Sequence, residues 1–266
     1  MIRAFLLQAG FAATALAADW RAQVTAPAPG TFPLPRALHA DYRCGWAALN
    51  AGNLEANFTR KGEVAQLSVK AGTAGFVRTL WRMDATHVAR AHTSTLLPID
   101  MRQMEFYRGK TLRTDLDFTA QNVTKFREWK PDDATPPKRK RFDYPNLFDL
   151  HTALLFVRSQ RLKEGDTLNL VIYPATAPYL ATIRVLGREW TQVKAGRYAA
   201  IKLDVRLQRI NQKFELEPHS KFKRATAWLS DDADRILLKA QADIFVGSVW
   251  VELNEVKFAA PAATGS

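Results

Sequence analysis

The densest group of charged side chains lies near the carboxyl end of the chain, where Asp231 and Asp232 are followed by Asp234 and Arg235. Two neighbouring carboxyl groups can share the acid and base roles of glycoside hydrolysis. Adjacent aspartates between two strand-like segments more often accept hydrogen bonds from the backbone of a turn. We therefore expect a turn here, and keep a carboxylate-dependent enzyme acting on glycans as an alternative hypothesis.

The histidines do not show the spacing of metal ligands. His87 and His92 are five residues apart, which places them on opposite faces if the segment is a strand. His151 lies beside an apolar helical stripe, has no second ligand four residues on, and is expected to be a partnered core or boundary residue. The sequence therefore predicts no metal site and no cofactor. The five histidines are His39, His87, His92, His151 and His219.

Cys44 is the only cysteine, so no intramolecular disulfide can form. No histidine or basic cluster adjoins it to lower the pKa of the thiol, and we interpret it as a small buried apolar residue. The chain also lacks a G-x-S-x-G elbow, an H-E-x-x-H helix, a P-loop and a paired C-x-x-C. We assign no catalytic residue.

Several aromatic residues fall in or beside segments with strand periodicity, and most of them should belong to the core. In a curved sheet, some could line a cavity for an acyl chain or a glycan, because aromatic walls with few polar groups are typical of small-molecule sites. We predict Tyr42, Trp46 and Trp228 as ligand-binding residues.

Alternation of apolar and polar residues predicts strands along most of the chain. Residues 54–59 and 65–69 form one predicted hairpin around a glycine turn, and residues 106–118 form another. In residues 201–207, four apolar side chains alternate with polar ones, so one face should be buried and the other wet. Short turns between successive strands imply antiparallel pairing.

One helix interrupts this pattern. Leu147, Leu150, Leu154 and Val157 recur at steps of three and four residues and predict a buried stripe. Asp149 lies near the start of the helix, and Gly165 is expected to end it. The predicted fold is mostly β: a strongly curved antiparallel sheet or barrel with one helix packed across it.

The amino terminus has the pattern of a secretory signal. Residues 1–17 contain a basic start, an apolar stretch and a small-residue site that predicts cleavage before Ala18, although a buried helix is the alternative. Residues 18–38 are rich in proline and alanine and should form an extended lead-in. A single β-rich domain is expected over 39–258, with a disordered tail at 259–266.

The formal net charge of +12 favours anionic partners, but the basic residues are dispersed and could serve solubility alone. In an exported protein the available polyanions are lipid head groups and acidic glycans, and we expect no nucleic-acid partner. The run Lys138-Arg139-Lys140-Arg141 lies in a predicted solvated loop over 130–144.

Four segments follow one another along the chain: Tyr42–Trp46 with Ala51-Gly52, Asp149–Arg158 with Gly165-Asp166, Gly196–Ile201, and Trp228–Asp232 with Arg235 and Gly247-Ser248-Val249. In this order they resemble the exported bacterial family called domain of unknown function 3108. The resemblance covers about 40–258 and implies an envelope location and a β-rich fold. The family implies no activity and no catalytic residues. Cys44 and the basic loop before Pro145 depart from its pattern.

The leading hypothesis is an exported, periplasmic protein that binds or carries an amphiphilic component of the cell envelope without catalysis. Its expected partners are lipid or acidic glycan, and peripheral contact with a membrane is compatible with this hypothesis. The alternatives are the glycan-directed enzyme and a structural adaptor of an envelope assembly. The oligomeric state is not determined by these patterns.

The strand at 201–207 gives a test of the curved-sheet prediction. Leu203→Ala should lower the free energy of unfolding by about 2–5 kcal/mol, because it removes a large side chain from the core. Lys202→Ala, on the other face, should change it by no more than about 0.5 kcal/mol. Thermal unfolding of both variants measures the difference, and equal losses would contradict the predicted pairing.

Overall fold

A computed structural model describes residues 19–107, 109–130, 136–219, 222–244 and 247–259. The predicted signal peptide and nearly all of the predicted tail lie outside these residues. The described chain forms one antiparallel sheet in the order β8-β7-β6-β5-β4-β3-β2-β1-β15-β14-β13-β11-β10-β9, with β12 paired to β11. The sheet is open, because β8 and β9 are its two edges.

The strands divide into an amino-terminal and a carboxyl-terminal series. The first comprises β1 (Leu38–Trp46), β2 (Leu49–Lys61), β3 (Val64–Thr73), β4 (Met83–His92), β5 (Pro98–Tyr107), β6 (Lys110–Phe118), β7 (Asn122–Lys130) and β8 (Lys138–Asp143). The second comprises β9 (Thr167–Ile172), β10 (Tyr179–Val193), β11 (Gly196–Ile210), β12 (Leu216–Pro218), β13 (Phe222–Ser230), β14 (Leu237–Ile244) and β15 (Ser248–Phe258). Both predicted hairpins are confirmed, as β2–β3 and β5–β6.

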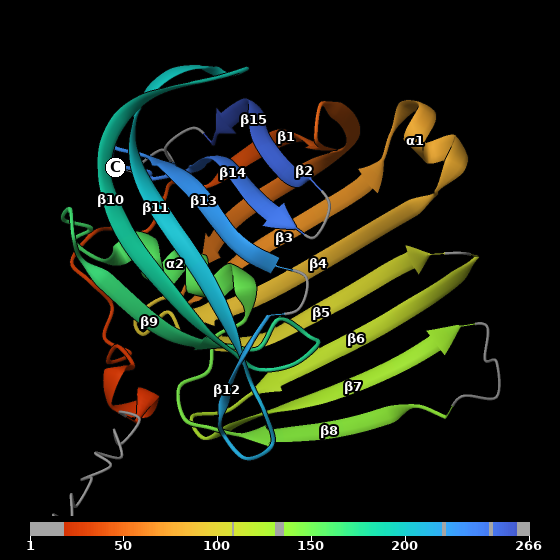
Figure 1. Cartoon of the computed structure of the whole chain (residues 1–266), viewed down its shortest axis with the longest axis vertical. Helices are drawn as coiled ribbons and strands as arrows, with labels where there is room; N and C mark the ends of the chain where they lie inside the picture. The colour runs from red at the N-terminus through yellow and green to blue at the C-terminus, as the bar shows by residue number, and fades with distance from the viewer. Residues whose placement is uncertain (1–18, 108, 131–135, 220–221, 245–246, 260–266) are drawn as a thin grey trace, which may run out of the picture.

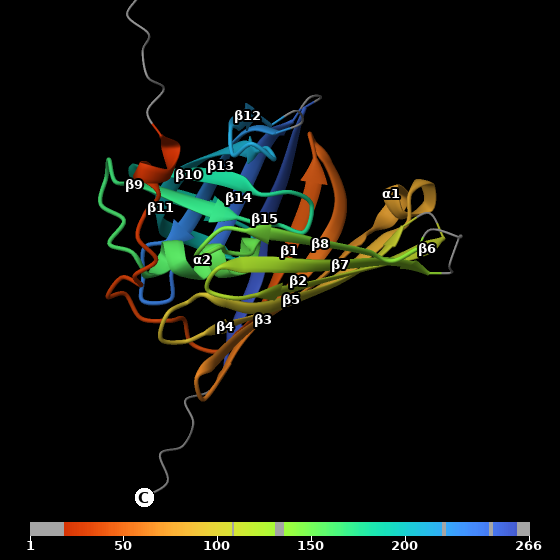
Figure 2. The same cartoon turned by 90° about the horizontal axis from the view of Figure 1, so that it is seen from below.

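The sheet curves strongly, so that its two series face each other across α2 (Leu150–Ser159), as Figures 1 and 2 show. Pairing of β1 with β15 joins the two series. Register shifts interrupt β1, β10 and β13, and such bulges bend a strand and increase its twist. This architecture confirms the predicted fold class.

The Asp149 side chain begins α2 by accepting hydrogen bonds from the backbone of His151 and Thr152. Past the first turn the helix is buried on more than one side. Phe156 belongs to the core of β9–β11, whereas Leu155 contacts Phe58 and Ala65 of β2 and β3. The predicted stripe is therefore too narrow, and it is wrong at Leu150, which is exposed.

The helix ends at Ser159, six positions before the predicted Gly165. The guanidinium group of Arg235, from the β13–β14 turn, donates to the backbone oxygens of Arg158, Gln160 and Arg161. These bonds satisfy carbonyl groups that the end of a helix leaves free. Gly165 instead forms the turn before β9, with φ of +87°. A side chain distant in sequence therefore sets the end of α2.

The predicted extended lead-in lies against the domain. It begins with the short helix η1 (Trp20–Gln23), and the indole of Trp20 donates to the backbone oxygen of Phe214 at 2.9 Å. Further on, the backbone N–H of Gly30 donates to Ser159 Oγ at 3.1 Å. A Cβ atom at Gly30 would lie 2.0 Å from the Ser159 carbonyl oxygen, so this close approach requires glycine.

The prediction of a solvated loop over 130–144 is wrong for the basic run Lys138-Arg139-Lys140-Arg141. Lys138–Asp143 is the edge strand β8, which pairs with β7. The four basic residues are exposed. Charged side chains on an edge strand oppose pairing with other chains, which explains why a strand here lacks apolar alternation.

Strand β11 buries the expected face only in part. Ile201 and Leu203 are fully buried against the α2 core, and Val205 and Leu207 are half-buried. On the opposite face, Asp204 is buried as well. Its carboxylate pairs with Arg206 at 3.1 Å and with Arg224, so the polar face is covered by its own ion pairs.

Arg235 provides a test of the helix anchor. Arg235→Met removes the hydrogen bonds to the end of α2 and the stacking of the guanidinium on Phe32, whose ring centre lies 3.5 Å away. Because bonds from a charged donor stabilise a fold more than neutral ones, we expect a loss of about 3 kcal/mol in the free energy of unfolding. Urea unfolding measures it. Arg161→Met, at an exposed position, is the control and should cost no more than about 0.5 kcal/mol.

Candidate ligand-binding face

Strand register identifies the face of the sheet that α2 covers. Leu203, which packs in the α2 core, pairs with Ala227 of β13, and Ala227 pairs with Ala240 of β14. The same row continues through Val251 of β15 to Cys44 of β1. A second row on this face passes through further small residues: Ala225, Ala242 and Val249. We call these two rows, from Ala227 to Cys44 and from Ala225 to Val249, the small-residue strip.

The small-residue strip is accessible to solvent, although it lies on the inner face. Ile201 and Leu229, next to α2, are completely buried. Ala227 of β13 and Ala240 of β14 are one and two strands beyond Leu203 in the first row, and they are only half-buried. Alanine side chains fill little space, so α2 covers one part of the inner face and leaves an apolar part open.

Cys44 lies on this strip as a half-buried free thiol. Burial raises the pKa of the thiol, so it stays protonated near neutral pH. A neutral thiol is a weak nucleophile and behaves as a small apolar group. Its position therefore adds to the apolar surface of the strip.

The three aromatic residues predicted to bind ligand lie in different surroundings. Tyr42 is 7% exposed, and its hydroxyl donates to the Leu237 carbonyl oxygen at 2.9 Å. Trp228 follows Ala227 in β13 and so points to the opposite face, where its indole donates to Glu189 at 2.6 Å. Trp46 is 45% exposed and pairs with Val249 at the end of the strip. Tyr42 and Trp46 both adjoin Cys44 on the face of the strip, but only Trp46 is accessible.

A pair of histidines joins α2 to the first series of strands. Nδ1 of His87, on β4, lies 3.2 Å from Nε2 of His151. The pKa of each imidazole is lowered to about 4, mainly by burial, and at His87 the charge of His151 contributes to this lowering. Both rings are therefore neutral at pH 7, and one donates a hydrogen bond to the other. In the described part of the chain, no three metal-binding side chains come together.

Sequence reasoning placed His151 in the core and His87 and His92 on opposite faces, but it missed the contact between His87 and His151. The two residues are 64 positions apart, and nothing in the local pattern connects them. The sequence held one signal for this contact, the alternation of residues between the two faces of the strand. His87 alternates with Ala85 and Ala89, and apolar residues at that spacing mark the inner face of a strand.

Asp231 and Asp232 lie on an exposed turn between β13 and β14. The Asp232 carboxylate accepts from Ser230 Oγ and from the backbone N–H groups of Asp234 and Arg235. Asp231 pairs with Arg188 at 2.8 Å. The two carboxylates thus stabilise the turn, as the preferred interpretation expected, and they do not converge in a cleft.

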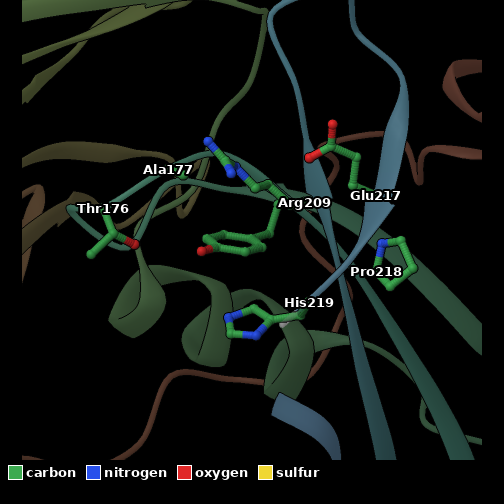
Figure 3. A pocket seen from close by; sticks show the side chains of 7 residues that line it. Thr176, Ala177, Arg209, Glu217, Pro218 and His219 are labelled. Atoms are coloured by element: carbon green, nitrogen blue, oxygen red, sulfur yellow. The ribbon is translucent and has the colours of Figure 1, made fainter. Parts of the chain in front are cut away.

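A small open pocket of about 280 Å³ lies between β11, β12 and the segment before β10. Figure 3 shows Arg209, Glu217 and His219 among its lining side chains. The ring of Tyr179 stacks on His219 with 5.2 Å between ring centres. The pocket is polar and mixes both signs of charge, so it does not extend the apolar strip.

A family model described as "Protein of unknown function (DUF3108)" matches residues 41–254. A β-barrel-like protein of domain of unknown function DUF1849 from Brucella abortus is similar in fold, with a TM-score of 0.59 and 12% sequence identity over 86% of this chain and 100% of that chain. The search of curated proteins finds no match.

Two more distant structures also align over 86% of this chain and 99% of their own. One is a candidate exported protein with a YmcC-like fold from Bacteroides fragilis, at a TM-score of 0.37 and 7% identity. The other is a candidate lipoprotein from Parabacteroides distasonis, at 0.35 and 8%. None of the helices in the described residues has the length and apolar character needed to cross a membrane.

The histidine pair predicts a dependence of stability on pH. Each imidazole has a pKa of about 4 in the folded state, against 6.5 for a free histidine. As pH falls from 6.5 to 4 the unfolded chain binds protons that the folded chain does not, so the stability present above pH 6.5 is progressively lost. The carboxylates of Glu105 and Asp149 oppose the shift at His87 without cancelling it.

Urea unfolding at pH 7 and pH 5 measures this loss. In His87→Gln the decrease between the two pH values should be smaller, because one buried titrating group is gone. His92→Gln, at an exposed histidine on the same strand, should keep the decrease of the original chain. Equal decreases in all three proteins would contradict the role of the pair.

Proposed function

Because this chain belongs to the DUF3108 family, which is described as having unknown function, we propose from its own geometry that it binds or carries an amphiphilic component of the bacterial cell envelope. The observation that carries the proposal is the small-residue strip, an apolar inner face that α2 leaves accessible. Removing each methylene group of an acyl chain from water stabilises a complex by about 0.8 kcal/mol. A face of alanine and valine offers such a chain contact without competing polar groups.

Access to the strip supports this proposal, because Ala227, Ala240 and Ala242 are half-buried and so reachable by solvent. The edges of the sheet add no further route, since Phe142 of β8 packs against Tyr173 and Phe214 next to β9 and β12. The polar end of an amphiphile could then remain in water while its chain lies along the strip. Binding of this kind requires no catalytic group.

The proposed location is the periplasm. The pattern of residues 1–17 supports export, and these residues lie outside the described structure. The single cysteine is compatible with an oxidising compartment, because it has no partner in the chain with which to form a disulfide.

The glycan-directed enzyme receives no support from Asp231 and Asp232. Both carboxylates are occupied by hydrogen bonds and an ion pair on an exposed turn. Catalysis by this pair would require both carboxylates in one cleft, and they do not share one.

Filling the strip tests the proposal. Ala240→Phe places a large ring on the inner face and should reduce bound lipid about tenfold, equivalent to about 1.4 kcal/mol of binding free energy. Full-length protein purified from the periplasm would be analysed by native mass spectrometry and lipid extraction, and titrated with a dansyl-labelled fatty acid.

Gln241→Phe is the matched control, because Gln241 is the next residue of β14 and is exposed on the opposite face. It should leave bound lipid unchanged. Absence of lipid and of fatty-acid binding in the original protein would overturn the proposal, as would equal binding by the two variants with folded spectra.

A further inference from the structure

The short helix α1 (Gly75–Leu80) presents its apolar side chains to water. Phe76 is 76% exposed and Leu80 72%, and Trp81 at the end of the helix is 49% exposed. No residue of α1 is buried. Helices of globular proteins normally face their apolar residues toward the core, and exposed apolar side chains such as these are typical of an interaction surface.

The helix is nevertheless held firmly. Arg78 forms a double hydrogen bond with Asp84 of β4, at 2.7 and 3.0 Å, and the backbone N–H of Ala74 donates to the Ala51 carbonyl oxygen at 2.9 Å. The ring of Trp81 contacts that of Tyr107 edge to face, with 5.9 Å between centres. The exposed apolar side chains therefore project from a fixed support.

Two neighbouring turns add to the same end of the sheet. The β1–β2 turn carries exposed Trp46 and Leu49, and it is tied to the β14–β15 turn by a 2.7 Å hydrogen bond from Ala47 to Ser248. Antiparallel order places this turn, α1 and the β5–β6 turn at one end, as Figure 1 shows. We call the five residues Trp46, Leu49, Phe76, Leu80 and Trp81 the apolar rim.

The apolar rim is flanked by cations. Arg82 and Lys130 are more than 60% exposed, and Lys138 and Arg139 are exposed at the start of β8. Lys110 begins β6 at the same end. Asp84 pairs with two cations, Arg78 and Arg82, and Glu128 pairs with Lys130, so basic groups outnumber acidic ones among these residues. An anionic partner is complementary to this end of the molecule.

We propose that the apolar rim docks the protein on the surface of an anionic phospholipid bilayer. Phe76, Leu80 and Trp81 enter the headgroup region, where aromatic and aliphatic side chains on a basic support are favoured, and the flanking cations contact lipid phosphates. A folded protein partner would be expected to meet a flat apolar patch, whereas these side chains project from separate turns. The rim also meets the small-residue strip where Trp46 pairs with Val249.

Vesicle flotation tests the docking. The full-length protein should float with vesicles of phosphatidylglycerol and phosphatidylethanolamine, and about tenfold less with phosphatidylcholine alone. Binding should weaken at 0.5 M salt, because surface electrostatics are screened within about one Debye length. Phe76→Ser combined with Leu80→Ser should reduce flotation at least about tenfold, the equivalent of about 1.4 kcal/mol.

Trp190→Ser is the control, since Trp190 is similarly exposed but lies on β10, outside the apolar rim. It should float as the original protein does. Circular dichroism and thermal unfolding check that each variant is folded. Lipid bound to each variant is measured separately, because the apolar rim and the small-residue strip are different surfaces.

Three results would overturn docking on an anionic bilayer. The first is failure of the original protein to float with anionic vesicles. The second is flotation unchanged in the double variant, or equal on phosphatidylcholine. The third is a dimer in light scattering that the double variant abolishes while flotation persists, because the rim would then join two copies of the chain. Loss of docking with bound lipid retained would leave the proposed function intact.

Discussion

The guanidinium group of Arg235 donates to the backbone oxygens that follow the last turn of α2, and the position of that helix decides which part of the inner face is closed. The same turn supplies the backbone oxygen of Asp234 to Arg158 and the carboxylate of Asp234 to Arg36. Helix, β13–β14 turn and lead-in therefore meet at one polar cluster. These contacts hold α2 over the core that Phe156 forms with Ile201 and Leu229.

This cluster gives a structural role to some of the segments by which the chain resembles its family. Asp149 begins α2, Arg158 lies near its end, and Arg235 holds the end against the sheet. These are the residues by which the chain resembles its family, and each has a structural partner. Two other such segments, Tyr42–Trp46 and Gly247–Val249, supply Cys44 and Val249 to the small-residue strip.

Three surfaces of different character follow from this arrangement. The part of the inner face beneath α2 is a dry core, the small-residue strip beyond it is apolar and accessible, and the end of the sheet carries exposed aromatic residues among cations. Its half-buried alanines make the second surface reachable, and the register of β1 and β15 connects it to the third. The proposed carriage of an amphiphile and the proposed docking on a bilayer therefore use two neighbouring but different surfaces.

Local pattern in the sequence determined the antiparallel strands, both glycine hairpins and the start of the helix at Asp149, because alternation, turn residues and a helix cap act over a few residues. It also indicated that Asp231 and Asp232 serve a turn. Only the tertiary structure decided where α2 ends, that residues 19–38 lie against the domain, and that His87 meets His151. Each of these depends on a contact between distant segments, and curvature and register bring such segments together without leaving a local trace.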